Sequence, residues 1–271
     1  MAKLDAKSIQ YRKQILDMID HARRGHIGSA FSIVEIVRVL YDDVLRFDPK
    51  KPEWPERDRF ILSKGHGCLA LYVALADKGF IKKTELKTLC ELDSILGGHP
   101  DANKIPGVEA STGSLGHGLP IGAGIALSGK IDSKDFRTFV LLGDGECNEG
   151  TVWEAALFSN KHKLNRLIAI IDYNKLQCFG KTCDVLELEP FADKWKSFGF
   201  EVKEVDGHDV EALRKVLSDT PLKGERPLAI ICHTVKGKGI KTLEGNASWH
   251  HKSRMSDELM KQLYGELGSN K

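Results

Sequence analysis

The sequence lacks the segments that direct a chain into or across a membrane. Residues 1–5 contain no apolar core of a secretion signal, and no apolar run approaches the length of a membrane span. The six cysteines include no Cys-x-x-Cys pair, so we interpret them as reduced, partly buried thiols. Cys147, inside a glycine-rich turn, is the one cysteine that could react, but nothing in the sequence indicates a depressed pKa of its thiol. These absences predict a cytoplasmic protein with no membrane partner.

Charge of one sign is not concentrated anywhere. The chain has 40 Lys and Arg against 38 Asp and Glu, a formal net charge of +2, and they are spread along its length. The sequence has no basic block and no interleaving of aromatic and basic residues, so a nucleic-acid surface is not expected. No internal repeat or composition shift marks a domain boundary. With 271 residues and 41% hydrophobic content, the chain can bury one large core or two small ones, and we expect a single domain over 1–271.

Apolar runs alternate with helical patterns through most of the chain. The strand-like runs lie near residues 60–62, 136–142, 167–171, 200–205 and 228–232. A helix is expected between the second and third of them, over residues 149–163. This alternation predicts an α/β fold of three layers (α/β/α), with a mainly parallel sheet and helices on both of its faces.

Helical patterns also mark the two ends of the chain. The apolar face of the first helix is formed by Ile15, Met18, Ile19 and Ala22. Ser32 lies three residues before Glu35, and we interpret the two as the capping box that begins a second helix. The C-terminal extension, about 240–271, is expected to be irregular, with a short closing helix near 257–263.

The most informative segment is GDGECNEG at residues 143–150, which follows one apolar run, while Asn174 follows the next. The carboxyl ends of parallel strands form a ligand crevice, so the Asp144 carboxylate and the Asn174 amide oxygen are expected side by side. Such oxygen ligands suit Mg²⁺ or Ca²⁺, which often share them with phosphates. Backbone N–H groups at a helix start just after Asp144 would contact the same anion. The sequence therefore predicts a metal-bridged diphosphate site.

Residues 143–174 resemble the signature shared by thiamine diphosphate enzymes. In that family an aspartate, an asparagine and a backbone carbonyl two residues beyond the asparagine hold the cation. The resemblance therefore implies thiamine diphosphate as the cofactor and Asp144, Asn174 and Leu176 as ligands of Mg²⁺, for which Ca²⁺ or Mn²⁺ could substitute. It also implies the thiamine diphosphate-binding fold, as a diphosphate-binding domain.

Further motifs extend the resemblance across nearly the whole chain, specifically to transketolase. They are GHIG at 25–28, RFILSKGH at 59–66, GHP at 98–100, TGSLGHG at 112–118, VKGKG at 235–239 and SWH at 248–250. One Gly-His pair is a weak signal, but six motifs in the family's order form a specific pattern. The implied cofactor-binding residues are His66, Gly113, Ser114, Leu115, Gly143, Asp144, Gly145, Glu146, Glu149 and Asn174. Among these, Glu149 matches a glutamate at the family's interface between two cofactors.

The resemblance implies catalytic roles for His26, His66, His99 and His250. His26 and His250 would exchange protons with the hydroxyls and carbonyl oxygen of a sugar, whereas His66 and His99 would bind the cofactor diphosphate and the donor hydroxyls. The imidazole pKa of about 6.5 suits such transfers. His251 follows His250 where glycine is frequent in the family, so the sequence leaves both as candidates for that role.

Transketolases also use a glutamate at the pyrimidine ring of the cofactor, carried by a second domain. Only about thirty residues follow Lys241, too few for another α/β domain. The resemblance thus implies the N-terminal subunit of a two-gene transketolase, paired with a C-terminal subunit that carries the pyrimidine-binding domain, in a symmetric α2β2 assembly. Its reaction would transfer a two-carbon ketol unit from a ketose phosphate to an aldose phosphate.

Other interpretations of the same fold are open. The chain could be the α subunit of a 2-oxoacid dehydrogenase or part of a deoxyxylulose-phosphate synthase, although the number of histidine motifs argues against both. It could also be a non-catalytic regulatory module. A module without catalysis has no physical need for Asp144, Asn174 and the four histidines, so we favour the enzyme.

Overall fold

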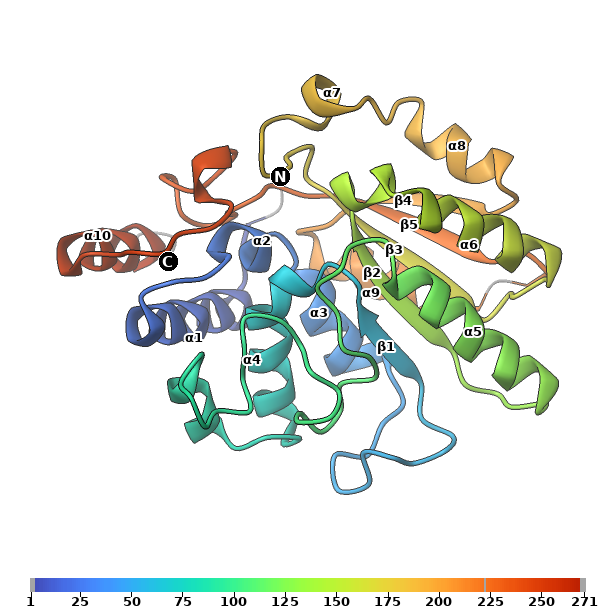
Figure 1. The fold of residues 1–271 in the computed structure, drawn as a ribbon, viewed down its shortest axis with the longest axis horizontal. Coiled ribbons are helices and arrows are strands. Elements are labelled where there is room, and N and C mark those ends of the chain that lie inside the picture. The colour runs from blue at the N-terminus through green and yellow to red at the C-terminus, as the bar shows by residue number, and fades with distance from the viewer. Residues whose placement is uncertain (1–2, 222, 269–271) are drawn as a thin grey trace.

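The computed structural model describes residues 3–221 and 223–268, which form a twisted parallel sheet between helices (Figure 1). The sheet has the strand order β1-β2-β3-β5-β4, and every neighbouring pair is parallel. Its strands are β1 Arg59–Leu62, β2 Thr138–Gly143, β3 Leu167–Tyr173, β4 Glu201–Asp206 and β5 Leu228–His233. All five predicted strand runs are confirmed, and so is the parallel sheet.

Helices cover both faces of the sheet, as the alternation in the sequence predicted (Figure 1). On one face lie α5 Gly118–Ile131, α6 Gly150–Lys161 and α8 Phe191–Ser197. On the other face lie α1 Ala6–Ala22, α2 Ile27–Ser32, α3 Val34–Val39, α4 Cys68–Lys78 and α9 Val210–Ser218, and α10 Asp257–Gly268 packs against α1. Short helical segments are η1 Leu40–Val44, η2 Gly65–Gly67, η3 Lys83–Thr88, η4 Gly145–Asn148, α7 Thr182–Val185 and η5 Ala247–Trp249.

The central strands are apolar on both sides because each side has its own core. In β2, Phe139 and Leu141 belong to the core under α1–α4, whereas Val140 and Leu142 belong to the core under α5 and α6. The same alternation runs through β3 and β5, whose residues are buried throughout except for His233 at the end of β5. A continuous apolar run is typical of a strand buried on both faces, which is why the sequence pattern identified these strands.

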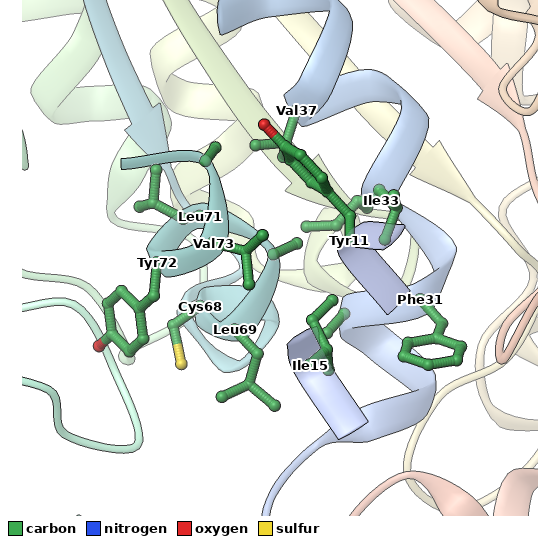
Figure 2. Close-up of a cluster of buried hydrophobic side chains, with 14 of the residues drawn as sticks. Tyr11, Ile15, Phe31, Ile33, Val37, Cys68, Leu69, Leu71, Tyr72 and Val73 are labelled. Carbon is green, nitrogen blue, oxygen red and sulfur yellow. The ribbon is translucent and has the colours of Figure 1, made fainter. Parts of the chain in front are cut away.

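The larger core is built by helices that contact one another as much as the sheet. Figure 2 shows Tyr11 and Ile15 of α1 facing Leu69 and Val73 of α4, all fully buried. Burial of such side chains contributes roughly 1.5–3 kcal/mol each, so this helical layer is a large part of the fold's stability. The predicted apolar face of α1 is confirmed.

The capping-box interpretation of Ser32 is wrong. Ser32 is the last residue of α2, and α3 begins at Val34 after Ile33, which provides no side-chain cap. The Ser32 hydroxyl instead donates to Asp172 on β3, with an Oγ–Oδ1 distance of 2.6 Å. A contact across 140 residues leaves no local signal, so the spacing to Glu35 was a coincidence. The closing helix α10 also extends further than expected, to Gly268.

Candidate active site

The carboxyl ends of β2 and β3 bring together the oxygen ligands that the sequence predicted. Gly143 pairs with Asp172 in the sheet, and Asp144 follows directly, 2% exposed. One carboxylate oxygen of Asp144 accepts from the Gly145 N–H at 2.7 Å, and the other accepts from the N–H of Lys175. Both oxygens keep a free lone pair, and the backbone holds the carboxylate rigidly between the two strand ends.

Asn174 and Leu176 continue the same turn. The Asn174 side-chain oxygen accepts from the Leu176 N–H at 3.0 Å, and its Nδ2 donates to Asp172 at 2.9 Å. The Leu176 carbonyl accepts from the Lys236 ammonium at 2.9 Å, which leaves one lone pair on that oxygen. An amide oxygen and a carbonyl oxygen therefore lie on the segment that is hydrogen-bonded to Asp144.

The oxygen atoms of Asp144, Asn174 and Leu176 suit the binding of a divalent cation. Burial, and next the charge of Asp172, raise the pKa of Asp144 to about 7. Within the described part of the chain no Lys, Arg or His forms an ion pair with Asp144, and the charge of Lys64 offsets its burial only in part. The described residues contain no group of three His, Cys, Asp or Glu that could hold a metal by themselves. A cation here would use Asp144, Asn174 and the Leu176 carbonyl and take its remaining ligands from an anion.

A helical segment starts just after Asp144, as predicted, but it is short. Residues 145–148 form the 3-10 helix η4, whose N-cap is Asp144, and α6 begins at Gly150. The Gly145 N–H donates to the Asp144 side chain, so this N–H is not a free donor. Contact between an anion and the other N–H groups of η4 stays a prediction.

A cavity of about 560 Å³ opens over these strand ends. Its wall contains most of the predicted cofactor and histidine residues, namely His26, His66, His99, Gly113, Leu115, Gly143, Asp144, Gly145, Glu146, Glu149, Asn174, Leu176 and His250. Ser114 does not line it, and its side chain is exposed. Motifs that are up to 224 residues apart, from His26 to His250, thus meet in one space.

Glu146 is buried and holds the site together. One of its carboxylate oxygens accepts from the Ser63 hydroxyl and from the Gly116 N–H at 3.0 Å, and the other accepts from the Gly143 N–H at 3.0 Å. These bonds join the end of β1, the loop before α5 and the end of β2. Glu149, in contrast, is exposed at the start of α6 and makes no capping bond.

Four histidines form a cluster at one side of the cavity. The His26 ring lies 5.5 Å from the His66 ring, 6.0 Å from His99 and 5.5 Å from His250, measured between ring centroids. Burial, followed by neighbouring positive groups, lowers the pKa of His26 to about 4 and that of His250 to about 3. Burial also lowers the pKa of His66 and His99. The pKa of each of the four rings is therefore lower than the ordinary imidazole value of about 6.5 that the sequence led us to expect. The rings are neutral near pH 7.

The structure gives His250 and His251 different positions. His250 lines the large cavity, and its Nδ1 lies 2.8 Å from the Lys236 ammonium. An ammonium can only donate, so His250 carries its proton on Nε2 when neutral. The His251 ring contacts His26 at 4.6 Å between centroids but lines a smaller, neighbouring cavity. The geometry therefore favours His250 for the role beside the cofactor.

Two buried lysines are functional candidates that sequence reasoning missed. Lys64 and Lys236 are 1% and 2% exposed and both line the large cavity. Lys64 forms an ion pair with Asp172, and although burial raises the pKa of Asp172, this pairing holds it below its usual value. Burial, and next the charge of Lys64, lower the pKa of Lys236 to about 8. Lys64 lies in the motif RFILSKGH and Lys236 in the motif VKGKG. Their positions beside glycine and histidine in these motifs could have marked them as candidates.

Cys147 is not an activated nucleophile. The thiol is buried, and burial followed by the charge of Glu146 raises its pKa well above the ordinary value. All six cysteines are free thiols. The buried, reduced Cys147 thiol agrees with the general expectation for the six cysteines and shows no sign of activation.

Comparisons with known proteins agree with the arrangement. The family model of the transketolase thiamine diphosphate-binding domain matches residues 5–271. The chain is 44% identical to a subunit of the apulose-4-phosphate transketolase of Phocaeicola vulgatus, over 92% of this chain and 88% of that one. It is 39% identical to the 6-deoxy-6-sulfo-D-fructose transketolase subunit SqwG of a Clostridium species, over 94% and 93%. Transketolase from Leishmania mexicana superposes with a TM-score of 0.88 and 29% identity, over 99% of this chain but only 42% of that one.

Proposed function

The chain belongs to the transketolase family, as the thiamine diphosphate-binding N-terminal subunit of a two-subunit transferase, and we propose how its residues serve that activity. The reaction transfers a two-carbon ketol unit from a ketose phosphate to an aldose phosphate. The observation that carries this proposal is the meeting of Asp144 and Asn174 with four histidines in one cavity. A diphosphate site alone would need no histidine cluster beside it.

Asp144, Asn174 and the Leu176 carbonyl would hold Mg²⁺, and through it the diphosphate of the cofactor. The buried, unpaired Asp144 carboxylate supports this assignment because a cation would stabilise its charged form. Lys236 is in the same wall, with a pKa of about 8, and is mostly charged near pH 7. Thiamine diphosphate, when bound, would supply a thiazolium ring that acts as the electron sink for cleavage of the donor's carbon–carbon bond. Gly113 and Leu115, which line the same cavity, would contact the cofactor through their backbones.

The histidines would handle the sugar through hydrogen bonds from neutral rings. His250 presents an Nε2–H donor, since Lys236 takes its Nδ1, so it would donate to a sugar oxygen. His26 lies between His66, His99 and His250 and can accept a proton as negative charge develops nearby. The lowered pKa of His26 means that its ring holds a second proton only transiently.

A C-terminal subunit with the pyrimidine-binding domain would complete the site, in an α2β2 assembly. The near end-to-end match to two proteins named as transketolase subunits supports a separate partner. Large apolar side chains beside the cavity also suit a covering surface, since Phe179 is 89% exposed and Leu186 57%. Exposed apolar groups at the rim of a polar site are typical of an interface. Glu149, exposed at the same rim, would then face the assembly.

The remaining expectations concern substrate and location. We propose sugar phosphates of pentose phosphate metabolism as substrates and a cytoplasmic location. Six free thiols suit a reducing compartment. The described residues contain no helix long and apolar enough to cross a membrane.

The assignment of Asp144 is tested by calorimetric titration of thiamine diphosphate in the presence of Mg²⁺. The Asp144→Ala variant of the assembled complex should show no detectable cofactor binding and no ketol transfer. Asp193→Ala is a matched control, because Asp193 is on α8 and its carboxylate pairs, among the residues that the structure describes, only with the exposed Lys196. Unchanged affinity in Asp144→Ala would contradict the metal assignment.

A further inference from the structure

Two adjacent arginines at the end of α1 have opposite environments. Arg23 forms ion pairs with Asp20 at 3.1 Å and Asp257 at 2.8 Å and donates to the Met255 carbonyl. Arg24 makes no hydrogen bond or ion pair with any residue that the structure describes, and it lines a second cavity of about 230 Å³. Arg24 is exposed at this wall, so its guanidinium is free to form hydrogen bonds with an anion.

This smaller cavity continues from the large one. His26, His66 and His99 line both, so they form the partition between the strand-end crevice and the space beside Arg24. The rest of its wall is mainly apolar, with Leu69, Leu89 and two cysteines, and none of the residues lining it is acidic. A ligand that reacts at the histidines and extends past them would therefore place its far end near Arg24.

The backbone fixes Arg24 in this position. Gly25 and Lys252 form an antiparallel bridge, with N–O distances of 2.9 and 3.1 Å, and Arg24 and His26 flank it on one strand. Ser253 and His251 flank it on the other, and both line the same cavity. Gly25 has a φ of +144°, and a Cβ there would lie 2.6 Å from the Ile19 side chain. The chain can make this turn only with glycine, and the turn fixes the backbone position of Arg24.

Arg24 is also the permanent cation of the cavity. It is the only Lys or Arg among the residues that line it, and burial keeps the pKa of His26, His66 and His99 low. The planar guanidinium binds tetrahedral oxyanions through two parallel hydrogen bonds. The chemistry of this wall, an apolar passage ending in one arginine, suits a carbon chain with a terminal oxyanion.

We propose that Arg24 binds the terminal phosphate or sulfonate of the sugar substrate and so determines specificity for charged sugars. This inference rests on the proposed function, because the sugar must have its reacting end at the histidine cluster. It assigns one anchor of the substrate to this chain, where the substrate's anionic end would otherwise depend on the partner alone.

The test uses the assembled complex and donors that differ only in their charged group. We would compare D-xylulose 5-phosphate with D-xylulose, with glycolaldehyde as an uncharged acceptor, in the parent and in Arg24→Gln. The variant should lose about tenfold or more in kcat/KM for the phosphorylated donor, mainly through KM, and less than about twofold for D-xylulose. The kcat/KM of Arg24→Lys for the phosphorylated donor should lie between that of the parent and that of Arg24→Gln. The control is Arg254→Gln, whose exposed side chain lines neither cavity.

A second donor pair distinguishes the two oxyanions. If 6-deoxy-6-sulfo-D-fructose and D-fructose 6-phosphate both lose efficiency in Arg24→Gln, the subsite accepts either group, and loss for one alone identifies the oxyanion it accepts. Equal losses for charged and neutral donors, or no loss, would overturn the proposal.

A binding measurement by NMR distinguishes failure of this proposal from failure of the proposed function. If the parent complex transfers no ketol unit from any donor, the proposed function fails, and NMR still tests Arg24. The Arg24 Nε–H signal should shift when ribose 5-phosphate is added to the chain and stay unchanged with ribose. No shift with ribose 5-phosphate would overturn the anion subsite.

Discussion

At the scale of single residues, burial sets the charge states on which the chemistry depends. The histidine cluster is neutral because burial lowers the pKa of each ring, and Lys236 fixes the tautomer of His250. His26 and His250 are therefore expected to act on the developing charges of the sugar. His66, which lies close to the charged Lys64, is expected to contact the cofactor diphosphate as well.

Substitution of individual histidines should separate these roles. In the assembled complex, His26→Ala and His250→Ala should lose about tenfold or more in kcat while cofactor affinity stays near the parent value, because groups that act in the transition state affect turnover more than ground-state binding. His66→Ala should weaken cofactor binding as well as rate. Steady-state kinetics and calorimetry measure both quantities.

His251→Ala provides the matched control, since this ring contacts His26 but lies outside the large cavity. A rate defect in His251→Ala without one in His250→Ala would reverse the assignment. Equal loss of cofactor in all of the other three variants would show that the cluster acts only as a binding wall.

At the scale of elements, close packing of α5 on the sheet depends on one glycine. A Cβ at Gly122 would lie 2.4 Å from the Cγ2 of Val140 on β2, whereas a Cβ at Gly124 would meet nothing within 4 Å. Val140 is β-branched and fully buried, so it cannot move aside easily. Gly122 therefore sets the distance between α5 and the sheet, and Gly124 does not.

Two alanine substitutions on this helix should have opposite effects. Gly124→Ala should raise the free energy of unfolding by about 0.5–1 kcal/mol, since alanine is the better helix former. Gly122→Ala should lower it, by roughly 1–3 kcal/mol from overpacking, less the gain in helix propensity. Urea unfolding monitored by circular dichroism measures both. A stabilised Gly122→Ala would show that α5 can shift without cost.

A buried charge network joins α1, α3 and the loop that carries Lys236. Glu35 accepts from Arg12 and lies 2.8 Å from His208 Nδ1, and all three are almost fully buried. Arg12 also donates to the Lys238 carbonyl at 2.7 Å, and the Val235 N–H donates to His208 at 2.8 Å. The network thus fixes the loop on both sides of Lys236.

The acid stability of the fold should depend on Glu35. Burial raises its pKa, but the charges of Arg12 and His208 and the hydrogen bonds from both side chains together outweigh burial and lower the pKa from 4.5 to about 2. A lowered carboxyl pKa gives stability that is fully present above about pH 4.5 and is lost as the pH falls through about 2, worth about 3 kcal/mol. Glu35→Gln should therefore lose about 3–5 kcal/mol at pH 7, since Arg12 is left buried without its partner.

The difference between parent and Glu35→Gln, measured by urea unfolding, should narrow between about pH 5 and about pH 2.5. Glu204→Gln, which removes an exposed pair with His233, serves as a control and should change stability by less than about 1 kcal/mol. A difference that stays constant over this range would contradict the assigned pKa.

At the scale of the whole molecule, much of the fold and site follows from local patterns. The five strands were predictable because residues such as Val140 and Leu141 are buried on opposite faces of the sheet, which gives continuous apolar runs. Asp144 and Asn174 were predictable because parallel strands end at one edge. The role of Ser32, the Lys64–Asp172 pair and the unpaired Arg24 were not, because each depends on contacts between distant segments.

The central claim also concerns the whole molecule: this subunit contains half of an active site. The strand ends of β2 and β3 and the histidine cluster line one face of the cavity, and the exposed Phe179 and Leu186 border it. We infer that a partner's pyrimidine-binding domain covers this face and brings the glutamate that activates the cofactor. Cofactor binding and turnover should then depend on the partner to different degrees.

The most direct test is ketol transfer by the purified chain before and after its partner is added. With Mg²⁺, thiamine diphosphate, a ketose phosphate and an aldose phosphate, the chain alone should give no detectable transfer. Addition of the C-terminal subunit should restore turnover and move the chain into a larger species on size-exclusion chromatography. Robust turnover by the chain alone would contradict the account, because it would show that one polypeptide contains the complete site.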